Sequence, residues 1–199
     1  MGQLLMLSGL EAAISSAEKE EVDLVRIVEE IVADGNFEGT AIGKSVDLQT
    51  TGSIVLKRAD AQVLRSACEN IIRNAIRFTA PGTTVQVVLE KNTTNGMPGR
   101  MSHEQTAILS VRDRGPGVPN ESLQRIFQPF FRVRREHDVS DGNGLGLAIA
   151  LEGVRMHGGE IEASNIQPKG LEVTVRLPIG DDGSSDDHQL SLRGHSATF

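Results

Sequence analysis

Two asparagines and an arginine stand at a spacing that could bind a charged ligand. Asn70, Asn74 and Arg77 fall at i, i+4 and i+7, and a helix at about 100° per residue places them on one stripe. These groups need polar partners, because burying one unsatisfied costs about 1–3 kcal/mol. A magnesium triphosphate would supply them, since Mg²⁺ prefers oxygen ligands and arginine pairs with phosphate oxygens. The alternative is the solvated face of an ordinary helix.

Two glycine-containing segments provide further candidates. Asp113-Arg114-Gly115-Pro116-Gly117 follows a β-rich run. A carboxylate at a strand end can accept hydrogen bonds from an exocyclic amine, and glycines let a flat ligand approach the backbone. Gly142-Asn143-Gly144-Leu145-Gly146-Leu147 precedes a helical run, where free amide groups and the helix dipole favour phosphate. A plain turn and a flexible hinge are the respective alternatives.

Phenylalanines are concentrated between these two segments. Phe127, Phe130 and Phe131 are three of the six in the chain, and the simplest expectation is a small hydrophobic cluster that pins a loop. Arg132 and Arg134 follow directly. They could reach phosphates from that loop, although a solvated run of charges is the simpler interpretation.

The hydrophobic pattern predicts the elements that must position these residues. Helices are expected over 23–33, from an N-cap at Asp60 to about Phe78, and over 145–157. The apolar stripe of the second helix comprises Leu64, Ala67, Cys68, Ile71, Ile72 and Ala75. Strands are expected over 44–48, 53–56, 83–90, 107–113, 160–164 and 171–177. Strands mixed with three helices favour an α/β sandwich, one sheet covered by helices on one face.

Composition and charge limit the class of protein. The chain has 199 residues, of which 38% are hydrophobic, and its formal net charge is −7. This length suits one domain with appendages. An acidic chain without a basic stripe argues against nucleic-acid binding, and no apolar run approaches the ~20 residues of a membrane span. Because the lone Cys68 forms no internal disulfide, we expect a reduced, cytoplasmic protein.

The four features occur in a recognisable order. The asparagine-bearing helix, the D-x-G-x-G segment, the phenylalanines and the glycine run closely resemble the ATP-binding domain of sensor histidine kinases. This family belongs to the superfamily shared with gyrase and the anti-sigma serine kinases. The resemblance covers 22–178 and implies the Bergerat fold, a two-layer sandwich with a mixed, mainly antiparallel sheet and about three helices. It also implies ATP and Mg²⁺ as cofactors of a catalytic domain over 22–179.

The resemblance implies a role for each feature. Asn74 would hold Mg²⁺, Asn70 would support the phosphates and the metal shell, and Arg77 would face phosphate. Asp113 would accept from the adenine amine, and 118–141 would form a lid over ATP, anchored by the three phenylalanines. The other implied nucleotide-binding residues are Gly115, Gly117, Val118, Phe127, Phe131, Gly142, Gly144, Leu145, Gly146 and Leu147.

One position distinguishes among the chemistries of the superfamily. In its ATPase branches, the residue four before the metal-binding asparagine is typically a glutamate that activates water. Here that residue is Asn70, an amide that cannot act as a general base. Glu69 is adjacent but lies ~100° around the helix. The resemblance therefore implies weak hydrolysis and transfer of the γ-phosphoryl group to an external acceptor.

The sequence departs from the family pattern ahead of this domain. A complete histidine kinase carries an acceptor histidine on the first of two dimerisation helices, but 1–21 contain no histidine. We expect 1–21 to be a remnant of the second helix, although a terminal helix lying on its own domain is the alternative. An acidic, disordered tail is expected over 180–199. The acceptor would then lie on a domain missing from this chain.

The implied partners follow from that departure. They are the dimerisation domain, a response regulator and a second copy joined through the missing helices, and the parent protein could be an inner-membrane sensor. Two alternative functions stay open: a stand-alone serine kinase of the anti-sigma type, and a non-catalytic, nucleotide-gated interaction module.

One further segment and one further residue have simple structural interpretations. Gly43-Lys44-Ser45 is similar to the end of a P-loop, but Glu38 replaces the required earlier glycine and a strand follows. His157 stands near a predicted helix end before two glycines, and we expect it to cap that helix.

Overall fold

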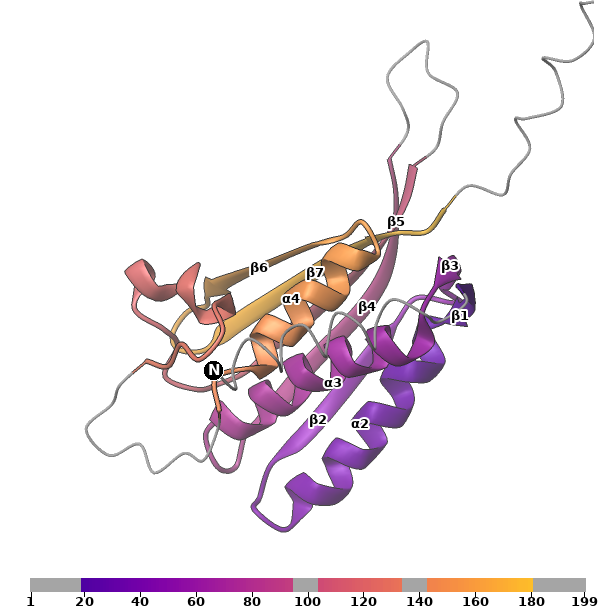
Figure 1. The fold of residues 1–199 in the computed structure, drawn as a ribbon. Coiled ribbons are helices and arrows are strands. Elements are labelled where there is room, and N and C mark those ends of the chain that lie inside the picture. Colours follow the sequence, from indigo (N-terminus) through magenta and orange to yellow (C-terminus); the bar gives the residue numbers. More distant parts are fainter. Residues whose placement is uncertain (1–18, 95–103, 134–142, 181–199) are drawn as a thin grey trace, which may run out of the picture.

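A computed structural model describes residues 19–94, 104–133 and 143–180. Over these ranges the chain forms two sheets, and three α-helices lie on one face of the larger sheet (Figure 1). The elements in chain order are β1 (Glu20–Asp23), α2 (Leu24–Thr40), β2 (Ser45–Thr50), β3 (Val55–Ala59), α3 (Ala61–Phe78), β4 (Thr84–Thr94), β5 (Glu104–Arg112), the 3₁₀ turns η1 (Asn120–Ser122) and η2 (Arg125–Phe127), α4 (Gly146–Met156), β6 (Glu160–Asn165) and β7 (Leu171–Pro178).

The larger sheet has the strand order β2-β4-β5-β7-β6. β2 and β4 are parallel, and the other neighbouring pairs are antiparallel. The predicted two-layer sandwich with a mixed, mainly antiparallel sheet is therefore confirmed. The expectation of a single sheet was wrong, because β3 does not join β2 but pairs with β1 as a separate two-stranded sheet.

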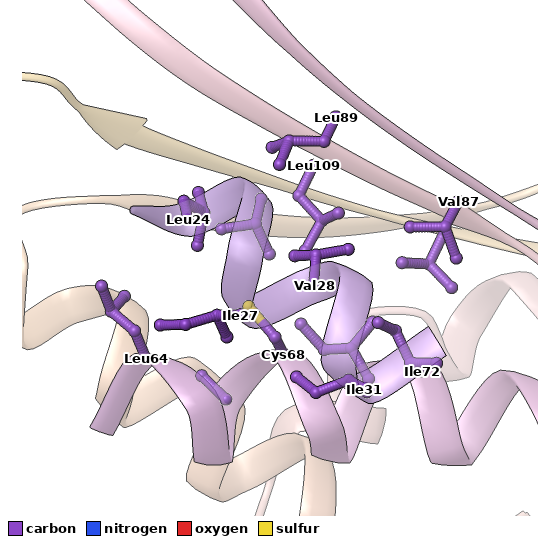
Figure 2. Packing of buried hydrophobic residues seen from close by; sticks show 14 of the residues in the cluster. Leu24, Ile27, Val28, Ile31, Leu64, Cys68, Ile72, Val87, Leu89 and Leu109 are labelled. Atoms are coloured by element: carbon purple, nitrogen blue, oxygen red, sulfur yellow. The ribbon is translucent and has the colours of Figure 1, made fainter. Parts of the chain in front are cut away.

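The core lies between the helices and the inner face of the larger sheet (Figure 2). Alternate residues of β7 are buried, as the period of two requires. The predicted apolar stripe of α3 is buried along its whole length, which confirms the period of that helix. Cys68 belongs to this stripe, and its burial raises the pKa of the thiol to about 12.

Helix α2 continues past its predicted end at Ala33 to Thr40. Glycine is a poor helix former, but packing at Gly35 outweighs this propensity. A Cβ on Gly35 would lie 2.7 Å from Ile76 Cδ1, so the helices approach closely at this point. The Asn36 amide then hydrogen-bonds both the N–H and the carbonyl of Val46, at 2.7 and 2.9 Å. These contacts fix the last turns of α2 against α3 and β2.

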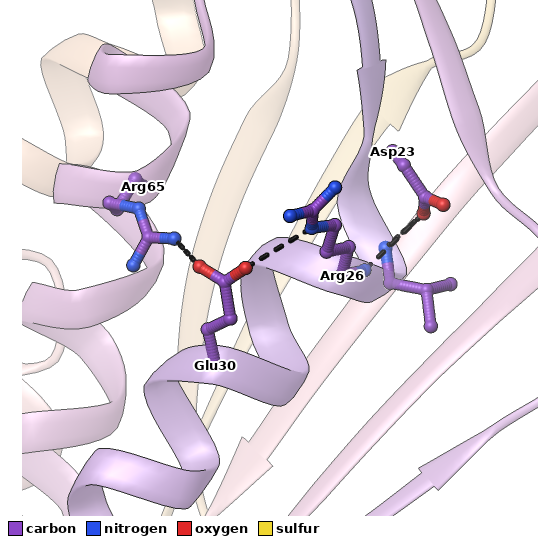
Figure 3. A network of polar contacts seen from close by, with 5 residues as sticks. Asp23, Arg26, Glu30 and Arg65 are labelled. Atoms are coloured by element: carbon purple, nitrogen blue, oxygen red, sulfur yellow. Dashed lines mark hydrogen bonds and ion pairs between the residues drawn. The ribbon is translucent and has the colours of Figure 1, made fainter.

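Polar contacts begin α2 and connect it to α3 (Figure 3). Asp23 caps the helix, its Oδ1 accepting from Val25 N at 3.0 Å and Arg26 N at 3.3 Å. The Glu30 carboxylate pairs with Arg65 of α3 and with Arg26, and these arginines, Arg65 first, lower its pKa. Because the pairs are exposed, they add little to stability compared with the core.

The N-terminal end of the domain differs from the prediction. Glu20 and Glu21, which the sequence assigned to an N-terminal helix, form the start of strand β1, because this strand pairs with β3. The rest of that expected helix, 1–18, and the expected tail beyond Gly180 lie outside the described residues. Over the described ranges, no helix is both long and apolar enough to span a bilayer.

Candidate nucleotide-binding site

A cavity of about 490 Å³ brings most of the predicted site residues together. This volume is within the range of small-molecule sites, roughly 300–1,000 Å³. The walls come from α3, the loop after β5, the segment leading out of η2 and the turn before α4. The lining residues are Asn70, Arg73, Asn74, Arg77, Phe78, Asp113, Pro116, Gly117, Val118, Ile126, Phe131, Arg132, Val133, Asn143, Gly144, Leu145, Gly146, Leu147, Ile149 and Leu171.

Helix α3 forms one wall, called the helix side below, with Asn70, Asn74 and Arg77 on a single stripe. Asn70 Nδ2 donates to the Ser66 carbonyl at 2.8 Å, which turns Oδ1 toward α4. A Cβ on Gly146 would lie 2.9 Å from that oxygen. The half-buried Asn74 amide has no hydrogen-bond partner within the described residues. Asn74 is therefore the amide on this wall that is left to bind something else.

Glu69 is directed away from the cavity, as predicted. Its Oε1 accepts from Arg73 Nε at 2.8 Å, and Arg73 also pairs with Glu38 of α2 at 3.0 and 3.1 Å. Glu69 does not line the cavity, whereas Arg73, which the sequence analysis did not select, does. The wall formed by α3 thus presents amides and arginines to the cavity, and no carboxylate of its own.

Asp113 belongs to a second wall, called the sheet side below, and is 4% exposed. Its Oδ1 accepts from Gly115 N at 2.7 Å and from Leu171 N at 3.2 Å, and its own N–H donates to the Leu171 carbonyl at 3.0 Å. The carboxylate is therefore held by backbone groups from its own loop and from β7.

The two glycines after Asp113 serve different purposes. Gly117 lines the cavity, and its φ of +71° lies in the left-handed region that favours glycine. Gly115 does not line it. A Cβ on Gly115 would lie 2.4 Å from the Phe78 carbonyl oxygen, so this glycine lets the loop cross the end of α3. The tight contact that requires a glycine here is thus with the end of α3, and the place of Gly115 against the ligand stays a prediction.

Two residues that the sequence analysis did not assign to the site fix the end of α3. Thr79 is 2% exposed, and its Oγ1 accepts from Arg114 N at 3.0 Å, which joins the helix end to the loop after Asp113. Lys44 Nζ donates to the carbonyls of Ile76 and Arg77 at 2.8 and 2.9 Å, and burial lowers the pKa of this ammonium. Lys44 is thus a helix cap, in agreement with the rejection of a P-loop.

The glycine run forms the third wall, ahead of α4. Gly144, Leu145, Gly146 and Leu147 line the cavity, while Gly142 lies outside the described residues. Gly144 has a φ of +68°, and its carbonyl accepts from Phe130 N at 2.8 Å. The first turn of α4 therefore begins at the cavity, where its backbone N–H groups have no partner within the helix.

The three phenylalanines separate into different environments rather than forming one cluster. Phe131 lines the cavity, with the Arg125 guanidinium 4.5 Å above its ring centroid. Phe127 is buried behind the wall, and Phe130 is 47% exposed. The backbone at Phe130 has a φ of +64°, and this turn sends its side chain outward. Arg132 is exposed, as expected, and also lines the cavity, whereas Arg134 lies outside the described residues.

His157 connects the two helices of the site. It is the C-cap of α4, as predicted, with Nδ1 2.7 Å from the Gly153 carbonyl. Its Nε2 accepts from the N–H of Asp60, the N-cap of α3, at 2.9 Å. The start of α3 and the end of α4 are therefore joined through one imidazole.

Sequence reasoning missed several apolar lining residues. Ile149 had a usable signal, because it lies one helical turn after Gly146 and shares its face. Leu171 had none, because only the pairing of β7 with β5 brings it to Asp113.

Three comparisons identify what the chain is similar to. The family model of histidine kinase-, DNA gyrase B- and HSP90-like ATPases matches residues 59–181. AfsQ2, a signal transduction histidine-protein kinase of Streptomyces coelicolor, is 34% identical over 145 residues, or 70% of this chain and 25% of its own length. The chain thus spans a quarter of that relative.

Solved structures agree with these sequence matches. The mycobacterial sensor histidine kinase MprB is 27% identical, with a TM-score of 0.64, over 80% of this chain and 97% of that structure. Full-length ShkA in complex with AMPPNP is 26% identical, with a TM-score of 0.58, over 82% of this chain and 31% of that structure. The chain therefore belongs to the family of histidine kinase-, DNA gyrase B- and HSP90-like ATPases, as an ATP-binding catalytic domain of the sensor histidine kinase type.

Proposed function

We propose that this domain binds Mg-ATP and donates the γ-phosphoryl group to a histidine on a dimerisation domain outside this chain. That histidine would then pass the group to an aspartate of a response regulator, within a two-component system. The observation that carries the proposal is the convergence of Asp113, Asn74 and the turn before α4 on one cavity. The structure of ShkA with AMPPNP, an ATP analogue, supports it.

Adenine fits the Asp113 end of the cavity. The carboxylate is nearly inaccessible and held by backbone N–H groups, so it is fixed as an acceptor for an exocyclic amine. Gly117 lines the cavity without a side chain, so the ring can approach its backbone, and Val118 and Ile126 provide apolar contact. Adenine would thus be recognised by one charge-assisted hydrogen bond and flat apolar packing.

The helix side and the first turn of α4 fit a magnesium triphosphate. Asn74, whose amide has no partner in the described part of the chain, is the residue we assign to Mg²⁺, because amide oxygens are suitable hard ligands. When bound, the ion would neutralise charge on the phosphates. Asn70 would support this shell through Oδ1, Arg77 would pair with phosphate oxygens, and the N–H groups at the start of α4 would bind them.

The same arrangement favours transfer over hydrolysis. The α3 residue four before Asn74 is Asn70, which cannot take a proton from water. Glu69 is paired with Arg73 and lies outside the cavity wall. Phosphoryl transfer depends mainly on positioning and charge neutralisation, so the domain can hold a reactive nucleotide until an acceptor histidine arrives.

A transfer assay tests the proposal. The chain is mixed with γ-labelled ATP and an intact dimerisation domain of a sensor histidine kinase, with and without its acceptor histidine. Acid-labile, alkali-stable label on the domain with the histidine supports the proposal. Acid-stable label on a serine would indicate a serine kinase, and nucleotide binding without any transfer would indicate a binding module; either result would overturn it.

A further inference from the structure

The last residue of β6 reaches across to the loop that follows Asp113. Asn165 Oδ1 accepts a hydrogen bond from Val118 N at 2.8 Å. Its Nδ2 donates to the Val118 carbonyl at 2.7 Å and to Asn120 Oδ1 at 3.0 Å. One side chain therefore satisfies both backbone groups of Val118, as a neighbouring strand would.

The loop is packed tightly against this amide. Gly117 has a φ of +71°, and a Cβ there would lie 2.7 Å from Asn165 Oδ1 and 3.2 Å from the Gly170 carbonyl oxygen. Gly170 closes the β6–β7 hairpin, where its carbonyl accepts from Ile166 N at 3.1 Å. The position of the loop is thus set by the hairpin, with Asn165 as the connecting side chain.

Gly117 and Val118 line the cavity, whereas Asn165 does not. The same hairpin leads into Leu171, whose N–H and carbonyl hold Asp113. The β6–β7 hairpin therefore positions both the Asp113 carboxylate and the wall formed by Gly117 and Val118. We propose that Asn165 is a positioning residue for adenine, holding the wall at Gly117 and Val118 at a fixed spacing from Asp113. This inference rests on the proposed function, because it takes an adenine nucleotide as the ligand.

Asn165→Asp is the most informative variant, because it nearly preserves shape. The carboxylate still accepts from Val118 N, but it cannot donate to the two oxygens that Nδ2 serves, and it faces them with negative charge. Asn92→Asp on β4 is the matched control. Asn92 is exposed, and its side chain has no partner within the described residues, so the control makes the same charge change away from the site.

The experiment measures the affinity of the full chain for Mg-ATP, Mg-ADP and adenosine by titration calorimetry, and the exchange of the Val118 amide by NMR. For Asn165→Asp we expect each ligand to bind about tenfold more weakly, the scale of one or two lost hydrogen bonds. The loss of affinity should be the same for Mg-ATP, Mg-ADP and adenosine, because all three contain adenine. Val118 exchange should rise about tenfold, and Asn92→Asp should change neither quantity.

Several results would overturn the inference. Wild-type affinity in Asn165→Asp would do so, as would a loss confined to ATP, which would place the effect at the phosphates. If that variant fails to fold, the wild-type chain decides: Val118 should exchange more slowly than exposed loop amides, and free exchange rejects the contact. A wild-type chain that binds none of the three ligands would instead overturn the proposed function itself.

Discussion

The sheet side and the helix side of the cavity are held in place in different ways. On the sheet side, Asp113 is 4% exposed, and its carboxylate accepts backbone N–H groups of Gly115 and Leu171. On the helix side, Asn74 and Arg77 project from a regular helix, and the Asn74 amide has no partner within the described residues. A carboxylate fixed by backbone groups cannot turn to suit a ligand, whereas an amide on a helix face can rotate about its own torsions.

This difference indicates how the two sides divide the work of binding. A preorganised acceptor loses little freedom when a ligand arrives, so its contacts count almost fully toward affinity and selectivity. Side chains that become ordered only when the ligand binds lose conformational entropy, and this loss offsets part of their interaction energy. We therefore expect the sheet side to determine which base is bound, and the helix side to determine how affinity depends on phosphate and metal.

The largest effect is expected on the sheet side, for Asp113→Asn. The substitution removes the charge but leaves an oxygen that can accept from Gly115 N, so the loop should persist. A hydrogen bond to a charged group contributes roughly 1.5–3 kcal/mol, so ATP should bind about 10–100-fold more weakly, with most of the preference over GTP lost. Titration calorimetry with both nucleotides measures this. Asp47→Asn on the exposed edge strand β2 is the control, and unchanged ATP affinity in Asp113→Asn would reject the assignment of the base site.

A smaller and more selective effect is expected on the helix side, for Asn74→Ala. Mg-ATP should bind about tenfold more weakly, which corresponds to roughly 1.4 kcal/mol, while metal-free ADP should lose less than about twofold. The reason is that Asn74 is assigned to the ion and not to the base or sugar. The measurement is a pair of titrations with and without Mg²⁺, with Asn92→Ala as the control. Equal losses for the two nucleotides would mean that Asn74 is not the metal ligand.

The same contrast explains which site residues could be predicted from the sequence. The helix side could be predicted because a helix repeats its geometry: once Asp60 was taken as the N-cap, the stripe of Asn70, Asn74 and Arg77 followed from the period. Gly144 to Leu147 of the glycine run and Asp113 were found in the same way, from short segments with a local meaning. These residues do meet at one cavity.

The supports of the sheet side could not be predicted in that way. Asn165, Leu171 and Thr79 act through residues far away in the sequence, and a local pattern contains no information about such partners. Gly115 shows the same limit. The sequence suggested that Gly115 makes room for a ligand. In the structure, a glycine is required here because a Cβ would lie 2.4 Å from the Phe78 carbonyl oxygen. The extension of α2 through Gly35 was missed because contact with Ile76 outweighs helix propensity.

The smallest effect is expected for Glu69→Gln, which tests whether α3 contributes no carboxylate to the cavity. Glu69 pairs with Arg73 at i, i+4, and such exposed pairs contribute about 0.3–0.5 kcal/mol. The free energy of unfolding in urea should fall by no more than this, and both the ATP affinity and the rate of any ATP hydrolysis should change by less than about twofold. A tenfold fall in hydrolysis would mean that Glu69 reaches the phosphates and activates water. The helix side would then carry a general base, and the division between a selective acid on one side and neutral or cationic groups on the other would no longer hold.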